Sequence, residues 1–329
     1  MRAAVSYYGP MEKEPHISVI VPVYNEEKNI PLLFSRLASV MNALPVSYEI
    51  IAVDDGSGDA SFDALMRVAS KDSHVNVIRF KRNFGQTAAL AAGIDHARGD
   101  TIVTIDSDLE NDPADIPRLL EKIDEGYEVV SGWRQGRWAG ALFTRRLPSI
   151  VANMIISAVT GVSLHDYGCT LKAYRSDVIK GVKLYGEMHR FIPAYAAWQG
   201  GRVAEIPVTH SPRKHGKSNY GFGRVFRVLL DLVVVVFMHR YMNRPMHFFG
   251  MWGLASLSFG FLVGCIAITL RIFVGLHLID TPLPVLTALL IIVGIQLVLF
   301  GVIGEMIMRT YYESQNRRPY TIKESTIEH

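Results

Sequence analysis

The sequence has few cysteines and no strong excess of charge of either sign. Only Cys169 and Cys265 occur among its 329 residues, and Cys265 lies in an apolar stretch, so we expect no disulfide framework. The net charge of +3 at pH 7 argues against a dedicated nucleic-acid-binding protein. The first sixteen residues contain no long apolar run, so we expect no cleaved signal peptide.

Several common site motifs are also missing. No Gly-x-x-x-x-Gly-Lys-Ser/Thr occurs, which excludes a P-loop, and no Gly-x-Gly-x-x-Gly follows the first expected strand, which argues against dinucleotide binding. The cysteines and histidines do not have the spacing of a zinc site. The serines and histidines do not stand in the context of a nucleophile elbow.

Apolar residues, in contrast, are abundant. Hydrophobic residues make up 49% of the chain and the mean hydropathy is +0.19, which is high for a soluble enzyme. Residues 248–270 and 283–304 are free of Asp, Glu, Lys and Arg. The first run would be about 35 Å long as a helix, enough to cross a bilayer. We therefore predict transmembrane helices at 246–272 and 283–306; a pair of buried core helices is the alternative.

Basic residues are concentrated before the first apolar run and after the second, and not in the loop that connects the two runs. Arg240 and Arg244 precede the first run, and Arg309, Arg317, Arg318 and Lys323 follow the second. The connecting loop has no Lys or Arg beyond Arg271 at its start. The positive-inside rule therefore predicts that the N-terminal part of the chain and the tail at 307–329 both lie in the cytoplasm.

The region from residue 17 to 130 alternates between strand-like and helix-like segments. The expected strands, rich in Val and Ile as in buried parallel sheets, are 17–23, 48–53, 75–80, 101–105 and 128–130. The expected helices are 26–43, 59–70, 85–97 and 114–125. This order predicts right-handed βαβ units and an α/β fold with a mainly parallel sheet.

Polar and acidic residues follow four of these strands at the point where each strand ends. Ligands of open α/β sheets bind at the carboxyl ends of the strands, so these residues should converge on one crevice. Asp106 and Asp108 would repel each other there unless a cation lay between them. Mg²⁺ or Mn²⁺, bridging to phosphate oxygens, is the expected partner, with Glu110 as a further ligand.

Several segments together resemble the polyprenyl-phosphate branch of family 2 glycosyltransferases, of the dolichol-phosphate mannose synthase and bactoprenol-phosphate glycosyltransferase type. They are VIVPVYNEE, VDDGS, RNFGQ, DSDLE, SGWR, DYGCTLKAYR and HGKSNYGFGR, and they extend over residues 17–235. The resemblance implies a Rossmann-like GT-A fold, a nucleotide-sugar donor, a divalent metal and inversion at the anomeric carbon. It also implies a homo-oligomer, with a tetramer as the expected state.

The resemblance implies roles for individual residues. The nucleotide sugar would be bound by Pro22, Tyr24, Glu26, Asp54, Asp55, Asp106, Ser107, Asp108 and Arg134. Asp54 and Asp55 are alternatives for holding the base or ribose. Asp166 matches the proposed catalytic aspartate. The acceptor and its phosphate would be bound by Arg213, Lys217, Ser218 and Arg137. Asn219 stands where many relatives have Lys, and Lys217 would supply that cation.

Basic and apolar residues alternate in two further segments that we expect to lie on a membrane surface. Residues 141–160 combine Arg145 and Arg146 with aliphatic residues and predict an amphipathic interfacial helix; an ordinary core-facing helix is the alternative. Residues 213–245 form a basic juxtamembrane segment that would attract an anionic lipid head group; a solvated loop is the alternative. The expected organisation is thus a tail at 1–16, a cytoplasmic GT-A domain at 17–212, this segment, the two spans and the tail.

The expected activity is transfer of a hexose-like sugar from a nucleotide, with UDP favoured, to undecaprenyl or another polyprenyl phosphate. The expected location is the inner membrane of a bacterium, as a multi-pass protein that serves cell-envelope glycan or lipid modification. Two alternatives stay open at this point. One is a family 2 transferase acting on a polysaccharide or lipid hydroxyl, and the other is a non-enzymatic membrane scaffold, against which the intact Asp106 and Asp108 pair speaks.

Overall fold

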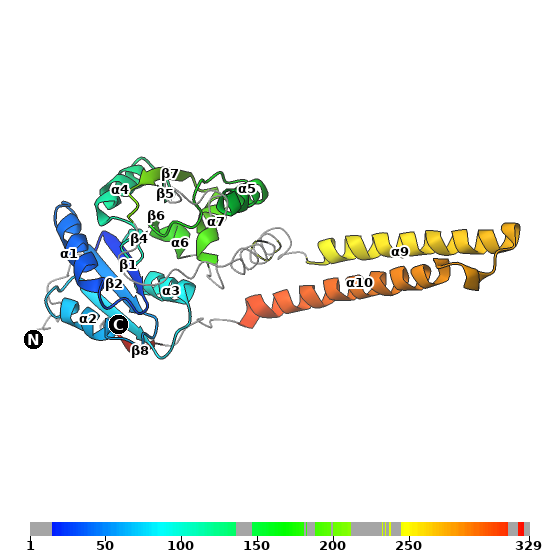
Figure 1. The fold of residues 1–329 in the computed structure, drawn as a ribbon, viewed down its shortest axis with the longest axis horizontal. Coiled ribbons are helices and arrows are strands. Elements are labelled where there is room, and N and C mark those ends of the chain that lie inside the picture. Colours follow the sequence, from blue (N-terminus) through cyan, green and yellow to red (C-terminus); the bar gives the residue numbers. More distant parts are fainter. Residues whose placement is uncertain are drawn as a thin grey trace, which may run out of the picture. The chain divides into compact units, whose positions relative to one another are not determined.

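The computed structural model describes residues 15–135, 147–180, 182, 188–198, 200–211, 245–314 and 322–325, with single residues at 232, 234 and 237. They belong to two compact units, one formed by residues 1–232 and 318–329 and the other by residues 233–317. The first unit contains a mixed sheet with helices packed on it, and the second contains a helical hairpin (Figure 1).

The sheet of the first unit has the strand order β7-β5-β6-β4-β1-β2-β3-β8. The strands are β1 Ile17–Val23, β2 Tyr48–Asp54, β3 Val75–Phe80, β4 Thr101–Thr104, β5 Val129–Arg134, β6 Lys172–Arg175, β7 Val203–Val208 and β8 Ile322–Ser325. β3, β2, β1 and β4 are parallel neighbours, and β5 is parallel to β7. β6 is antiparallel to β4 and β5, and β8 is antiparallel to β3. The prediction of a mainly parallel sheet is confirmed.

Helices cover both faces of this sheet. The larger core packs α1 (Ile30–Met41), α2 (Ser61–Ala69) and α4 (Ile116–Asp124) against alternate residues of the central strands. On the other face α3 (Gln86–His96) approaches β1 so closely that a Cβ on Gly93 would lie 2.4 Å from Ile20 Cγ2. The remaining elements of this unit are η1 Pro113–Asp115, α5 Leu147–Thr160, α6 Ser176–Ile179, η3 Met188–Phe191 and α7 Ile192–Trp198.

The strands and helices expected from the sequence lie within a few residues of their observed bounds. The first helix is the largest difference, because it begins at Ile30 and not at residue 26. Residues 25–27 instead form a loop whose backbone amides are bound by side chains of the loop at 57–61, for example Glu26 N by Ser61 Oγ at 2.8 Å. The last predicted strand, 128–130, extends to Arg134.

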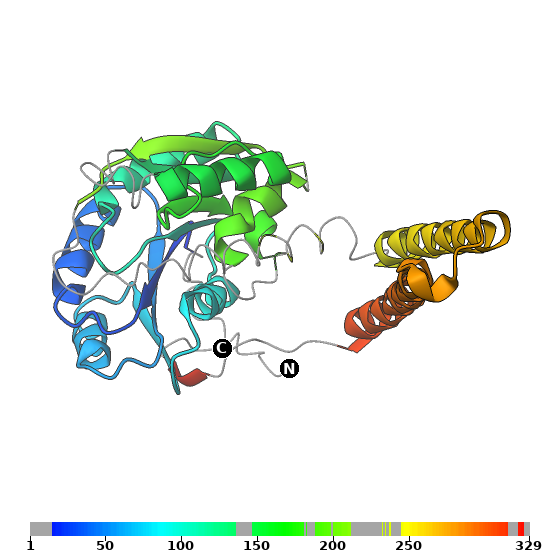
Figure 2. The same cartoon turned by 45° about the vertical axis from the view of Figure 1, so that its right-hand side comes forward.

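The second unit is a hairpin of two long apolar helices (Figure 2). α9 spans Pro245–Thr269 and continues through η4 at Leu270–Val274; after η5 at Leu278–Asp280, α10 spans Leu283–Ser314. Small residues allow the helices to approach closely, since a Cβ on Gly253 would lie 2.9 Å from Gly294 O. Pro245–Val274 and Leu283–Ile307 are long and apolar enough to span a membrane, and few of their residues are buried in the structure.

Candidate functional site

The carboxyl edge of the sheet holds those residues singled out from the sequence that the structure describes. β1, β2, β4 and β5 run in the same direction, so their carboxyl ends all lie at this edge. Asp166 reaches the same edge by a different route, since it precedes β6, which runs antiparallel and pairs Lys172 with Thr104 at the end of β4. The segment before β6 therefore lies beside the loop after β4.

The loop after β1 exposes Tyr24, and hydrogen bonds hold the rest of the loop in place. Pro22 is buried in β1, whereas Tyr24 is 49% exposed. The side chain of Glu26 accepts a hydrogen bond from Asn29 Nδ2 at 2.5 Å. Asn25 adopts a left-handed backbone with φ of 55°, and its Oδ1 accepts from Gly58 N at 2.8 Å. Tyr24 is thus available to a ligand, while Glu26 also serves the loop itself.

Asp54 and Asp55 at the end of β2 are both buried and both bind within the protein. Asp54 accepts from Ser57 N at 3.1 Å and lies 3.5 Å from Arg79 Nε. Asp55 accepts from Asn83 Nδ2 at 2.9 Å and from the backbone amides of residues 84 and 85, at 2.7 and 2.9 Å. Burial raises the pKa of Asp55, and these backbone bonds oppose the rise. Asp55 therefore fastens the end of β2 to the start of α3.

Gly56 makes this contact between two loops possible. Its φ is +66°, and a Cβ at this position would lie 2.3 Å from the carbonyl carbon of Arg82. We expect Gly56→Ala to lower the free energy of unfolding by about 1–3 kcal/mol for the backbone conformation, with the collision adding to that cost. Denaturant unfolding of the purified variant measures the loss. Gly58→Ala is the matched control, since nothing lies within 4 Å of the added Cβ there.

The loop after β4 carries the acidic residues predicted to bind a metal. Ser107 and Asp108 are buried, and Asp106 is partly exposed and accepts from Gln86 Nε2 at 2.6 Å. Burial of the carboxylate and the neighbouring Asp108 raise the pKa of Asp106 to about 6, and the guanidinium of Arg134 opposes the rise. Two adjacent carboxylates in this state fit a hard divalent cation. No group of three His, Cys, Asp or Glu side chains that could hold a metal occurs in the described part of the chain.

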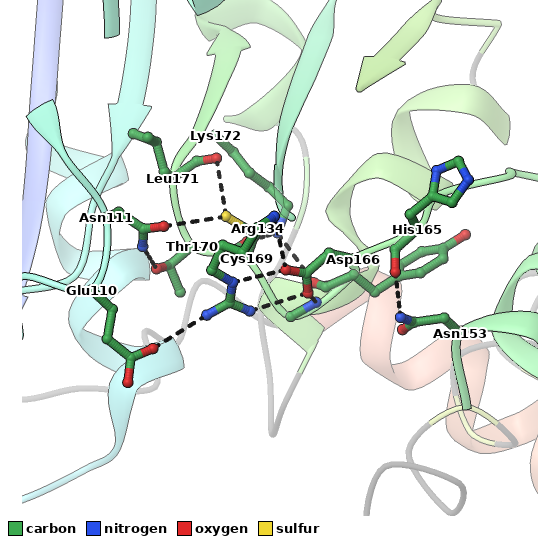
Figure 3. Close-up of polar contacts among 12 residues, drawn as sticks. Glu110, Asn111, Arg134, Asn153, His165, Asp166, Cys169, Thr170, Leu171 and Lys172 are labelled. Carbon is green, nitrogen blue, oxygen red and sulfur yellow. Dashed lines mark hydrogen bonds and ion pairs between the residues drawn. The ribbon is translucent and has the colours of Figure 1, made fainter. Parts of the chain in front are cut away.

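A buried arginine joins the acidic loop to Asp166 (Figure 3). Arg134 Nε and Nη2 donate to Asp166 Oδ2 and Oδ1 at 2.7 and 3.1 Å, and Arg134 Nη1 lies 3.5 Å from Glu110 Oε2. Asp166 Oδ1 also accepts from Gly168 N at 3.1 Å. Both oxygens of Asp166 are therefore engaged, and a carboxylate oxygen of Glu110 faces Arg134.

Further hydrogen bonds tie the Asp166 segment to the acidic loop. Thr104 Oγ1 donates to Thr170 O at 2.6 Å, and Asn111 Nδ2 donates to Thr170 Oγ1 at 3.3 Å. Ser211 N donates to the carbonyl of Glu110 at 2.9 Å. Ser211 stands two residues before Arg213 in the sequence. Arg213, Lys217, Ser218 and Arg137 themselves lie outside the described residues.

Three residues of the site had no role in the sequence-based prediction. Gln86 lies in the motif RNFGQ, but only the fold places its amide on Asp106. Glu205, on β7, accepts from the backbone amides of His165 and Asp166. Lys172, at the start of β6, lies inside the turn that follows Asp166. A glutamate and a lysine within short strands carry no local sequence signal for such roles.

Comparison with known proteins assigns this arrangement to a family. Residues 18–182 match the model of glycosyl transferase family 2, and the match includes Asp106, Asp108, Arg134 and Asp166. The chain belongs to glycosyltransferase family 2. This family 2 enzyme is 43% identical to the dodecaprenyl-phosphate galacturonate synthase of Rhizobium johnstonii, over 94% of this chain and 92% of that protein.

Other relatives and solved structures agree with this assignment. The family 2 enzyme is 38% identical to the undecaprenyl-phosphate 4-deoxy-4-formamido-L-arabinose transferase of Shewanella sediminis, over 94% of this chain and 92% of that protein. Its fold is similar to glucosyl-3-phosphoglycerate synthase from Mycobacterium tuberculosis, with a TM-score of 0.52 and 18% identity, covering 68% of this chain and 79% of that one. The GT-A fold predicted from the sequence is confirmed.

Proposed function

We propose that this glycosyltransferase moves a sugar from a nucleotide, with UDP favoured, to a polyprenyl phosphate. The observation that carries the proposal is that the acidic pair Asp106 and Asp108 lies beside the Arg134–Asp166 ion pair. The same chain contains two candidate membrane spans. Two relatives that match over more than nine-tenths of this chain are named for polyprenyl-phosphate substrates. We further propose inversion at the anomeric carbon, in keeping with the resemblance.

Asp106 and Asp108 are the residues that would hold Mg²⁺ or Mn²⁺ in this proposal. A bound cation of this kind neutralises charge that develops on the leaving diphosphate. The similar mycobacterial synthase was crystallised with Mn²⁺ and UDP-glucose, which supports a divalent metal here. Tyr24 and one of the alternatives Asp54 and Asp55 would contact the nucleotide from the first two strand ends, and Ser107 and Arg134 would lie on the side of the phosphates.

The acceptor phosphate monoester has a second pKa of about 6, so it is mostly a dianion near neutral pH. It needs less help from a base than a hydroxyl does. Asp166, with both oxygens already bonded, then positions Arg134 and the acceptor more than it removes a proton. Arg213, Lys217, Ser218 and Arg137 bind the acceptor phosphate in the proposal, and the tie between Ser211 and Glu110 supports this role.

The catalytic unit and the C-terminal tail lie on the same side of the membrane in this proposal. β8, which follows the second candidate span, pairs with β3 of the catalytic sheet, and an even number of crossings returns the chain to its starting side. The distribution of basic residues favours the cytoplasm as that side. We propose a bacterial inner-membrane protein with residues 17–212 as the catalytic domain and 213–245 as the juxtamembrane segment.

Helix α5 is the proposed interfacial helix of the catalytic unit. Its outer surface exposes Ile150, Val151, Met154, Ile155 and Val159, while Ile156 and Thr160 are buried. Met154 is 64% exposed. We expect Met154→Glu to lower kcat/KM for polyprenyl phosphate in vesicles by about tenfold, because the apolar burial of this side chain in lipid is lost. The KM for the donor should not change.

The matched control for Met154→Glu is Met66→Glu on α2, where methionine is also exposed, at 37%. Initial rates at varied acceptor give kcat/KM for polyprenyl phosphate, and initial rates at varied donor give the KM for the donor. Equal losses in the two variants would contradict the interfacial role of α5.

Metal-dependent labelling of lipid tests the proposed function. Membranes containing the protein are incubated with undecaprenyl phosphate and a panel of radiolabelled nucleotide sugars. We expect one donor to label the lipid fraction, EDTA to abolish the labelling, and Mg²⁺ or Mn²⁺ to restore it. Absence of transfer from every donor would contradict the proposal and favour a scaffold.

A further inference from the structure

Lys172 occupies a buried position that the proposed mechanism does not use. It is the first residue of β6, and only 2% of its surface is exposed. Its Nζ donates to the carbonyl oxygen of Tyr167 at 3.2 Å and also to that of Cys169. The ammonium group therefore lies within the turn formed by residues 166–169 (Figure 3).

The surroundings of Lys172 make a positive charge costly. Burial lowers the pKa of Lys172 to about 8, and the guanidinium groups of Arg134 and Arg190 act in the same direction. Asp166 and Cys169 oppose this decrease. An ammonium group placed in the interior near two other cations lowers stability unless its hydrogen bonds compensate. The two carbonyl oxygens are the compensating contacts. The charge on Lys172 therefore requires this conformation of the turn, and that conformation requires the charged donor.

The same turn fixes the orientation of Asp166. Cys169 N donates to the backbone carbonyl of Asp166 at 3.3 Å, and Gly168 N donates to its carboxylate. The peptide group between Tyr167 and Gly168 links the two contacts, because its carbonyl points toward Lys172 and its amide points the opposite way, toward the Asp166 carboxylate. Without a cation between them, the two carbonyls of Tyr167 and Cys169 would lie buried without this donor, and the turn would rearrange to satisfy them.

We propose that Lys172 is a positioning residue, which holds the turn at 166–169 so that Asp166 meets Arg134 with both carboxylate oxygens. Its effect on the reaction rests on the proposed function, whereas its effect on the turn does not. A cation is the essential feature, so Lys172→Arg should preserve the role, and Lys172→Met, of similar length but without charge, should remove it.

The reactivity of the Cys169 thiol reports on the conformation of the turn and can be measured without an assay of sugar transfer. Its side chain is fully buried, and burial raises the pKa of its thiol to about 11, so alkylation in the native protein should be slow. Cys265 is the only other cysteine in the sequence. In full-length Cys265→Ser protein, we expect Lys172→Met to speed maleimide labelling of Cys169 by about tenfold or more, and Lys172→Arg to leave it slow. Lys172→Gln serves if the methionine variant does not fold.

Glu49→Gln is the control for a general loss of stability. Glu49 is also buried and charged, but it binds Ser18 and Arg98 near the amino-terminal end of β2, away from this turn. Its substitution should leave the labelling of Cys169 slow. Equal labelling rates in Lys172→Met and in the parent protein, or equally fast labelling in Glu49→Gln, would overturn the inference.

A double-mutant cycle with Asp166→Asn tests the consequence for the reaction. We expect Lys172→Met to lower kcat by about tenfold or more with a nearly unchanged KM for the donor, and to have much less effect when Asp166 is already asparagine. Additive losses would overturn the positioning role. Absence of transfer by the parent protein would contradict the proposed function instead, and the labelling of Cys169 would still decide the role of Lys172 in the turn.

Discussion

Asp108→Asn and Asp106→Asn are each expected to lower kcat/KM by about a thousandfold, which corresponds to about 4 kcal/mol of lost transition-state stabilisation. The reason is that an amide cannot replace an anionic oxygen ligand of the divalent cation. Initial rates at varied donor give kcat/KM, and titration of activity with Mn²⁺ at saturating donor gives the metal requirement. Half-maximal activity should require a higher metal concentration in both variants, because the proposal assigns the metal to these two carboxylates.

Asp112→Asn is the control in the same loop. Asp112 caps the 3₁₀ turn η1 by accepting a bond from Ala114 N at 3.1 Å, and it lies 3.5 Å from Arg36. Its substitution removes a negative charge near the site without altering the proposed ligands, so activity should change little. A comparable loss in Asp112→Asn, or an unchanged metal requirement in Asp106→Asn and Asp108→Asn, would contradict the proposed metal site.

Asp166→Asn is expected to lower kcat by about a hundredfold, at the lower limit of the loss that removal of a general base gives. The structure explains why the loss should be substantial without such a role. Asparagine can still accept from Arg134 with one oxygen, but the second oxygen and the charge that balances Arg134 are gone. The dependence of the rate on pH should be the same in both proteins, because the acceptor dianion needs no base.

Asp177→Asn provides a matched control for this substitution, since Asp177 is an exposed aspartate just after β6. Rates across the pH range are compared at saturating donor and polyprenyl phosphate. Near-normal turnover of Asp166→Asn would rule out any catalytic or positioning role for Asp166. A loss that disappears at high pH would instead indicate a proton acceptor.

The sequence predicted the central strands well because buried parallel strands are runs of Val and Ile. β6 was not predicted, since a strand of four residues that includes Lys172 and Arg175 has no such signature. That omission matters for the site, because the antiparallel direction of β6 is what brings Asp166 to the carboxyl edge. β8 was missed for the same reason, and its pairing with β3 is a long-range contact that no local pattern encodes.

Local motifs identified the acidic loop and Asp166 but not how they are connected. Arg134 was expected near the donor, yet its bonds to Asp166 and its approach to Glu110 depend on side-chain geometry. Asp54 and Asp55 stay alternatives for holding the nucleotide, since both are bonded within the protein: Asp54 accepts from Ser57 N in its own loop, and Asp55 accepts from the backbone amide of Phe84 after β3. The structure supplies what the motifs lacked, namely the contacts of Gln86, Lys172 and Glu205.

The chemical nature of the acceptor is the central claim, and one comparison tests it most directly. The purified full-length protein in vesicles is given a labelled donor, Mg²⁺ and either undecaprenyl phosphate or undecaprenol. The account predicts that only the phosphate is labelled and that mild acid releases the sugar from the product. Labelling of undecaprenol at a similar rate, or a product that resists mild acid, would contradict it.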